Sequence, residues 1–379
     1  MMDRPSPDEL RRIPRWRRFV VQWDISHNAV ALAFFAFTGM WQTAALHFGM
    51  IQIPRAIWYT MYFVSCLILS ISALIYLTRA IIYPRSIIDD FNHKRLINFF
   101  FMPVMIGALC ILTTPLFLRT LNQFIVGFYV LGAYQVGLAL YLYGDWLFGL
   151  HPTNFIHPLV FMQTIGFFLL ANIGASAHLV EHAFAMLSVG CLFWLLVFIT
   201  NFQHLSPALD KGSERPQPTF FLFIAPPAQA ALAFVVLQMA EAVNPEKKNA
   251  LLTIVNDMEW PKAAQAFLYI DLFLYLLMFR LFPTFWTQKF SVSWWAYIFP
   301  LSAAASSVIW RYKVEEEMFW GVLAVLLGLI ACVAMIVVSC FTVWALGSGR
   351  TPNNPRCLDA YYRYYVGCSS EDMDPSLPI

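Results

Sequence analysis

The stretch MFWGVLAVLLGLIACVAMIVVSCFTVWAL (residues 318–346) decides the class of fold, because it contains no charged side chain. About 20 apolar residues in an α-helix are long enough to cross the hydrocarbon core of a bilayer, whereas a barrel strand needs only about 10. Backbone polar groups in lipid must also be hydrogen-bonded within the protein. Residues 318–346 therefore predict a membrane-spanning α-helix.

The composition of the whole chain predicts many such helices. Of the 379 residues, 60% are hydrophobic and 12% are charged, whereas a soluble domain carries about 25% charged residues. The net charge of +2 predicts no nucleic-acid partner. Most cysteines lie within apolar runs, which argues against a disulfide framework; these are Cys66, Cys110, Cys191, Cys332 and Cys340. We expect no cofactor and no resident metal.

Ten apolar segments are long enough to span a membrane, and together they predict an all-α polytopic membrane protein. They form one transmembrane domain, residues 26–346, between a basic N-terminal segment (1–25) and a C-terminal tail (347–379). The predicted spans are residues 26–47, 56–82, 98–117, 121–148, 154–177, 183–205, 218–240, 263–283, 292–311 and 318–346.

The distribution of Lys and Arg predicts the orientation of the chain. These residues are more numerous in the connections on the side of the two termini, which places both termini in the cytoplasm. The basic stretch at residues 11–19 contains five Arg interleaved with Ile13, Trp16 and Phe19. We expect this stretch to lie on the anionic cytoplasmic leaflet.

Prolines divide the ten spans into two classes. Pro103, Pro158, Pro226, Pro227 and Pro300 all fall in odd-numbered spans. Proline removes a backbone donor and bends a helix, and the freed carbonyls are tolerated where they face protein or a water-filled cavity. We therefore expect kinked odd spans inside and straight even spans outside, as five hairpins around a central path. Helix packing without a pore is the alternative explanation.

Aromatic residues beside two of these prolines are candidates for closing such a path. Phe299 precedes Pro300, and Phe99, Phe100 and Phe101 precede Pro103 at the matching position of span 3. A bulky ring beside a kink can block a pore and exclude water. Ordinary aromatic packing explains the same spacing equally well, so both interpretations stand.

Two carboxylates and one short motif suggest other chemistry. Asp271 in span 8 and Asp145 at the end of span 4 are candidate charge or proton sites, which a proton-coupled transporter would use. Their position on even spans favours a passive path. His178, Glu181 and His182 match an H-x-x-E-H zinc motif, but the match is short and no third ligand follows. A metalloenzyme is therefore a remote alternative, and we predict no enzyme activity.

Five motifs, in order, resemble one membrane-protein family. They are DFNHKRLINFFFMP (90–103), YGDW (143–146), PTN (152–154), PTFFLFIAPP (218–227) and FSVSWWAYIFP (290–300). The chain is similar to the slow-type anion channels of plant guard cells and the tellurite-resistance/dicarboxylate transporters. The similarity covers about residues 86–345, and Asp145 stands where the plant channels have Gln.

The resemblance implies a quasi-fivefold ring of hairpins whose odd helices line a pore, one pore per subunit of a homotrimer. It implies that Phe299 occludes the pore and that an aromatic among Phe99 to Phe101 assists it. The conducted species would be small anions such as chloride, nitrate or malate, and the location would be the plasma membrane. A proton-coupled organic-anion or sulfite exporter on the same fold remains the alternative. Residues 1–25 and 347–379 are short beside the plant channels' Ser/Thr-rich termini, so regulation by a kinase is left open.

Overall fold

The computed structural model describes residues 15–148, 157–210, 217–242, 260–283 and 290–347, and in these residues every regular element is a helix. Among these residues, nine helices are long and apolar enough to cross a membrane, and a tenth span forms if the bent pair Pro84–Asn92 and Leu96–Leu112 is counted as one. The expected all-α polytopic membrane fold is therefore confirmed.

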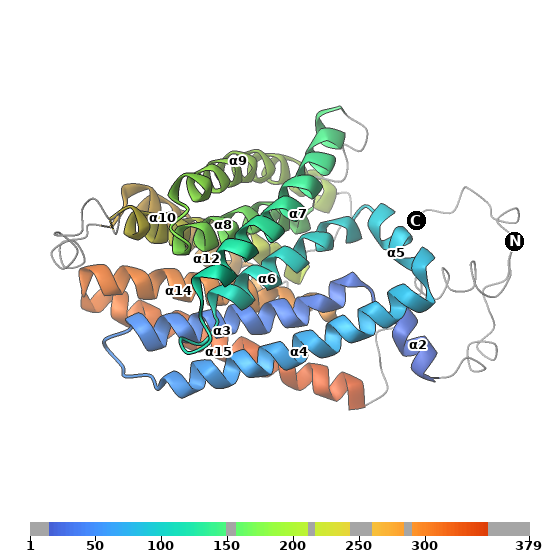
Figure 1. The fold of residues 1–379 in the computed structure, drawn as a ribbon, viewed down its shortest axis with the longest axis horizontal. Helices are drawn as coiled ribbons and strands as arrows, with labels where there is room; N and C mark the ends of the chain where they lie inside the picture. The colour runs from blue at the N-terminus through green and yellow to red at the C-terminus, as the bar shows by residue number, and fades with distance from the viewer. Residues whose placement is uncertain (1–14, 149–156, 211–216, 243–259, 284–289, 348–379) are drawn as a thin grey trace, which may run out of the picture.

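The inner elements come first in each hairpin, and the outer elements follow. The inner helices are α3 (Ala29–His47), α6 (Met102–Leu112), α8 (Phe161–Ser176), α10 (Ala225–Ala242) and α14 (Ile298–Glu315). The outer helices are α4 (Arg55–Ile82), α7 (Leu121–Leu147), α9 (Val180–Asp210), α12 (Lys262–Arg280) and α15 (Met318–Gly347). Two short helices, α2 (Arg15–Gln22) and α5 (Pro84–Asn92), lie at one end of the bundle (Figure 1).

The inner helices form a closed ring. Helix α3 contacts α6, α6 contacts α8, α8 contacts α10, α10 contacts α14, and α14 returns to α3. Each inner helix also packs against the outer helix that follows it in the chain. The long helices run beside one another along the long axis of the molecule (Figure 1). Five hairpins in a ring are the arrangement expected from the proline pattern and the resemblance.

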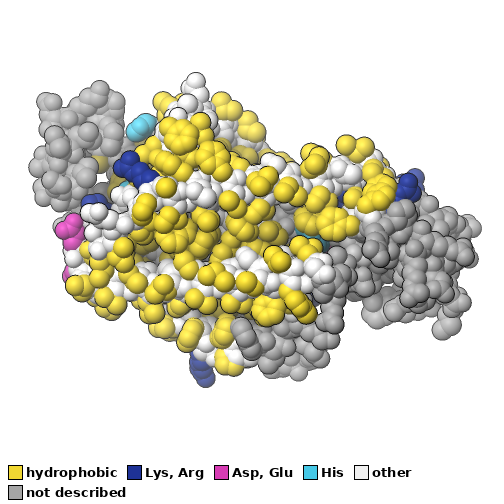
Figure 2. Space-filling model, turned by 90° about the horizontal axis from the view of Figure 1, so that it is seen from below, with side chains coloured by type: hydrophobic (Ala, Val, Ile, Leu, Met, Phe, Trp, Pro, Cys, Tyr) yellow, Lys and Arg dark blue, Asp and Glu magenta, His cyan; other side chains and the backbone are white. Residues whose placement is uncertain are grey.

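Burial separates the two classes of helix. Over the apolar 18-residue stretch of the spans that contain α8, α10 and α14, 83–94% of the residues are buried, whereas over the same length of the five outer helices the share is 17–33%. The first span lies between these values at 50%, and it is the odd span without a proline. Figure 2 shows the result on one face, where apolar side chains cover the surface and charged ones lie near its margins. The outer helices therefore present the surface that lipid would solvate.

The third span is shorter than expected, because α6 ends at Leu112 and not near residue 117. Pro115 follows closely, and the residue before a proline avoids the helical region. The last carbonyls find other donors: Gln42 and Arg119 both donate to the carbonyl of Leu112, at 3.0 and 2.9 Å. At the other end of the span, α5 meets Leu96–Leu112 at 106°.

The prolines lie where one kind of helix passes into another. Each inner span begins with a 3-10 helix, and these cover Ile25–Asn28, Leu96–Phe101, Pro158–Val160, Pro218–Phe223 and Val292–Tyr297. Pro103, Pro226, Pro227 and Pro300 all fall in the first turn of the α-helix that follows, and Pro158 opens its 3-10 helix. Proline is tolerated in a first turn, because its missing N–H would have no intrahelical partner there.

Candidate functional site

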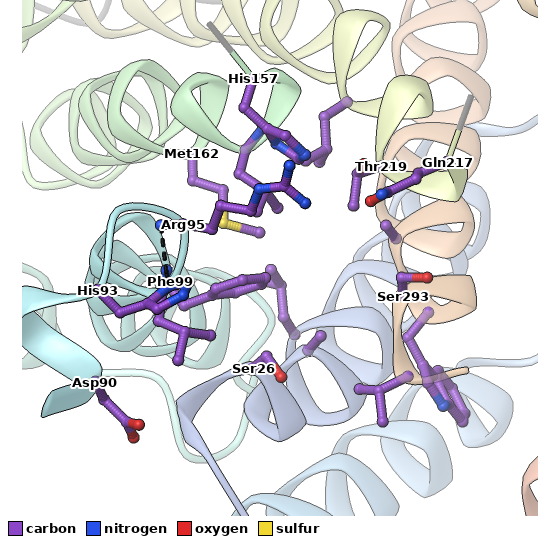
Figure 3. Close-up of a pocket in the computed structure, with 18 of the residues that line it drawn as sticks. Ser26, Asp90, His93, Arg95, Phe99, His157, Met162, Gln217, Thr219 and Ser293 are labelled. Atoms are coloured by element: carbon purple, nitrogen blue, oxygen red, sulfur yellow. Dashed lines mark hydrogen bonds between the residues drawn. The ribbon is translucent and has the colours of Figure 1, made fainter. Parts of the chain in front are cut away.

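A cavity of about 320 Å³ opens where the five inner spans begin. Every inner span contributes side chains to its wall, and α4 and α5 complete it. Figure 3 shows side chains from several of these elements converging on one space. A cavity that all five repeats line lies on the axis of the ring, so it marks where a central path would begin.

The 3-10 geometry explains which side chains line the cavity. Side chains three residues apart eclipse one another in a 3-10 helix. Leu96 and Phe99 form such a pair, Thr219 and Leu222 form another, and Ser293 and Ala296 a third. The spacing continues across the junctions with the α-helices, to Phe299 after Ala296 and to Met162 after Leu159. In the sequence, the last large lining residue of each inner span is apolar, and we call this set the apolar layer: Leu32, Phe99, Met162, Leu222 and Phe299.

The same geometry separates the three candidate phenylalanines. Successive residues of a 3-10 helix point about 120° apart, so one of three can face the cavity. Phe99 lines it. The ring of Phe100 packs on Phe91 at 5.2 Å, and Phe101 is fully buried in the helix packing. Phe299 lines the cavity from the opposing repeat and is also buried.

Polar side chains cap three of the 3-10 helices at the mouth. Asp24 accepts from the backbone N–H of Ser26 at 3.0 Å, His93 Nδ1 accepts from the N–H of Leu96 at 3.3 Å, and His157 Nδ1 accepts from the N–H of Leu159 at 3.2 Å. Burial alone would raise the pKa of Asp24, but the hydrogen bonds and charge of His27, with Ser26 and Arg79, lower it overall. These hydrogen bonds fix where three of the inner spans begin.

A buried ion pair holds α5 against α4 at the cavity wall. The guanidinium of Arg79 donates to both carboxylate oxygens of Asp90, and Nη2 lies 3.1 Å from Oδ1. Nη1 also lies 3.3 Å from the carbonyl oxygen of Trp23. Arg79 is 1% exposed and Asp90 4%. Because both residues line the cavity, this pair sets the position of the wall where the chain turns into the third span.

A chain of amide side chains joins three helices behind the wall. Gln163 Nε2 of α8 donates to Asn98 Oδ1 at 2.9 Å, and Gln135 Nε2 of α7 donates to the carbonyl of Gln163 at 2.6 Å. All three residues are buried. Gly166 makes room for the chain, since a Cβ there would lie 2.7 Å from Gln135 Cδ.

The candidate carboxylates do not line the cavity. Asp145 is half-buried at the end of α7. Asp271 is fully buried on α12 beside Ser307 of α14. The Ser307 hydroxyl donates to the carbonyl of Ala304 at 2.8 Å, and neither Asp271 oxygen has a hydrogen bond within the described residues.

The zinc motif does not lie on one helix. His178 adopts a left-handed conformation, with φ of 60°, and it precedes α9, whereas Glu181 and His182 lie in its first turn. The His182 ring instead contacts the rings of Phe128 and Tyr129 at 6.1 and 6.0 Å. Among the described residues, no group of three or more His, Cys, Asp or Glu side chains is placed to hold a metal ion.

Comparison with known proteins identifies the family. A family model described as voltage-dependent anion channel (SLAC1) matches residues 23–343, which include the first nine spans and most of the tenth. The chain belongs to the SLAC1 family. Its members are anion channels and not enzymes, and the chain is an integral membrane protein with many apolar helices.

Three relatives of this SLAC1-family chain come from Arabidopsis thaliana. The S-type anion channel SLAH2 is 26% identical over 78% of this chain and 54% of its own length, and SLAH3 is 27% identical over 86% and 48%. The guard cell S-type anion channel SLAC1 is 24% identical over 62% of this chain and 39% of its own length. The chain thus spans about half the length of these relatives, and an anion channel is what they are named for.

Several residues of the site were not singled out by the sequence. The Arg79–Asp90 pair joins two helices across a bend, and no local pattern reveals such a pair. Met162 and Leu222 lack any chemical signature. Both residues lie three positions after another lining residue, Met162 after Leu159 and Leu222 after Thr219, so an i, i+3 spacing is the pattern they share.

Proposed function

We propose that this chain conducts small anions passively through the ring of inner helices, entering at the cavity described above. The observation that carries the proposal is that all five inner spans line one cavity on the ring axis. The names of its relatives supply the ion class. Chloride, nitrate and small organic anions such as malate are the proposed species.

We propose that Phe299 occludes this path and that Phe99 assists it. Both belong to the apolar layer of the cavity, from different repeats. A ring in an apolar constriction closes a path by filling it and by excluding water. Phe100 and Phe101 point elsewhere and take no part in this gate.

The wall carries two guanidinium groups and two carboxylates, so its formal charge is balanced. Asp90 is bound to Arg79, Asp89 also borders the cavity, and Arg95 projects into it beside His157 (Figure 3). The proposed preference for anions therefore depends on the position of Arg95 and on the helix starts. The 3-10 helices also begin at this end, and a helix start carries partial positive charge. Neither Asp145 nor Asp271 lines the cavity, which supports a passive path over the proton-coupled exporter.

The proposal extends to assembly and orientation. We propose a homotrimer with one path per subunit, in the plasma membrane, with the cavity and both termini on the cytoplasmic side. The excess of Lys and Arg on the side of the termini supports this orientation.

Replacement of the two phenylalanines tests the gate. We expect Phe299→Ala to raise basal anion current severalfold in oocytes at equal surface expression, and Phe99→Ala to raise it less. Phe100→Ala is the matched control, because Phe100 is half-buried like Phe99 in the same 3-10 helix but outside the cavity lining. Current that reverses at the anion equilibrium potential identifies the ion.

Two results would contradict the proposal. If Phe299→Ala reaches the surface and carries no more current than wild type, Phe299 is a packing residue. If the reversal potential of the current follows the proton gradient, transport is coupled to protons and is not passive.

A further inference from the structure

The side chain of His157 has two nitrogens with different roles. Nδ1 accepts the N–H of Leu159 at 3.2 Å and thereby caps the 3-10 helix Pro158–Val160. A ring nitrogen that accepts carries no proton, so the proton of this imidazole is on Nε2. The cap therefore fixes a neutral tautomer with one N–H donor at the far end of the ring.

Nε2 of His157 is buried and has no hydrogen-bond partner among the described residues. His157 is 5% exposed, and it lines the cavity. A buried donor left without an acceptor is unfavourable. The ring is already held by its cap, so the second nitrogen is available to a cavity occupant that accepts a hydrogen bond.

A positive charge lies beside this donor. Arg95 projects into the cavity from the start of the third span, and Figure 3 shows its guanidinium and the His157 ring on the same side of the space. The charge of Arg95 disfavours a second positive charge on the His157 ring, which agrees with the neutral tautomer. An occupant that accepts a hydrogen bond and carries negative charge would interact favourably with both.

We propose that His157 Nε2–H and the Arg95 guanidinium form an anion-binding subsite at the entrance of the path. The proposal rests on the proposed function, because it assigns a resting position to the anion that the channel conducts. Its ligands are small monovalent anions, of which chloride and nitrate serve as probes. The neutral N–H and the cation together hold an anion without trapping it, since one donor is uncharged. Thr219 of the neighbouring inner span faces the same space (Figure 3).

The substitution His157→Asn separates the two roles of the ring. Asn Oδ1 replaces Nδ1 as the cap, for which Asn is well suited, but the side chain is too short to present a donor where Nε2 lies. Arg95→Ala removes the charge. The matched control is Lys94→Ala, which removes the same charge from the adjacent exposed residue outside the cavity lining.

The test measures conductance against chloride or nitrate concentration on the cavity side, using Phe299→Ala as the open background. We expect His157→Asn and Arg95→Ala each to raise the half-saturating concentration about five- to tenfold, and the double variant to raise it less than their product. Lys94→Ala should leave it within about twofold. Equal effects of Arg95→Ala and Lys94→Ala, or no effect of His157→Asn, would overturn the subsite.

A binding measurement keeps the subsite testable if no current is found. Nitrate should raise the unfolding temperature of the purified full chain in detergent, relative to gluconate at equal ionic strength. We expect His157→Asn to lose most of this shift, and Lys94→Ala to keep it. Absence of current with a retained, His157-dependent shift would contradict the proposed function alone, whereas current without any dependence on His157 would contradict the subsite alone.

Discussion

Breaking the Arg79–Asp90 pair at the mouth of the cavity should lower the unfolding temperature of the protein. The pair is buried, and Arg79 donates to both carboxylate oxygens. Removing one member of a buried ion pair leaves the other charge uncompensated, which typically costs about 3–5 kcal/mol. In Asp90→Ala the guanidinium of Arg79 keeps its hydrogen bond to the carbonyl of Trp23. We therefore expect a loss of stability at the lower end of this range, about 3 kcal/mol. At about 2 °C per kcal/mol for a long chain, the unfolding temperature should fall by about 6 °C.

The free cysteines provide the assay. Cys66, Cys110, Cys191 and Cys332 are half-buried free thiols in the spans, so a thiol-reactive fluorophore reports unfolding in detergent. The control is Asp89→Ala, which removes a carboxylate one residue away, and we expect a shift of less than about 2 °C.

A double substitution separates a buried charge from lost packing. Replacing both partners by apolar residues is often neutral or stabilising, so Arg79→Met with Asp90→Leu should recover most of the loss. The reasoning is refuted if the double variant loses the sum of the two single effects, or if Asp90→Ala and Asp89→Ala behave alike.

Two further predictions concern the helix interfaces. Asp271→Asn should keep the anion current and its independence of the proton gradient, because the amide has the same shape and the passive path does not use this carboxylate; loss of current at normal surface expression would favour the coupled exporter. Gly166→Ala should lower stability by about 1–3 kcal/mol, because its Cβ overlaps Gln135, which then gives up its bond to Gln163. The control is Gly137→Ala, which lies on an exposed helix surface where a Cβ meets nothing within 4 Å. This variant should be neutral or stabilising by up to about 1 kcal/mol. Equal losses of stability in the two glycine variants would show that Gly166 is not constrained by Gln135.

The architecture could be predicted because apolar stretches mark the membrane spans and because prolines mark the starts of most inner helices. The ranges of nine spans agreed within a few residues over the described chain, and the third ended early because Pro115 and Arg119 act together on the last turn. The inner class followed from proline in four of the five spans, where a proline lies at or near the start of the inner helix, and the first span has none.

The cavity was harder to predict, since its lining depends on the direction in which side chains point and not on composition. The sequence does not distinguish Phe99, Phe100 and Phe101 from one another. Their side chains point in different directions because residues 96–101 form a 3-10 helix. His157 precedes Pro158 in the sequence, but the different roles of its two nitrogens become visible only in the folded cap. Asp90 and Arg79 come together because α5 folds back at an angle that no local pattern encodes.

The 3-10 helix at the start of each inner span means that the direction of a lining side chain depends on how tightly a short stretch of backbone is wound. A residue turns by about 120° in a 3-10 helix and about 100° in an α-helix. Converting the three steps from Leu96 to Phe99 would therefore rotate the phenyl ring by about 60° and shorten this stretch by about 1.5 Å. Because a 3-10 helix borders the cavity in every inner span, the width of this opening is tied to the local winding of the backbone.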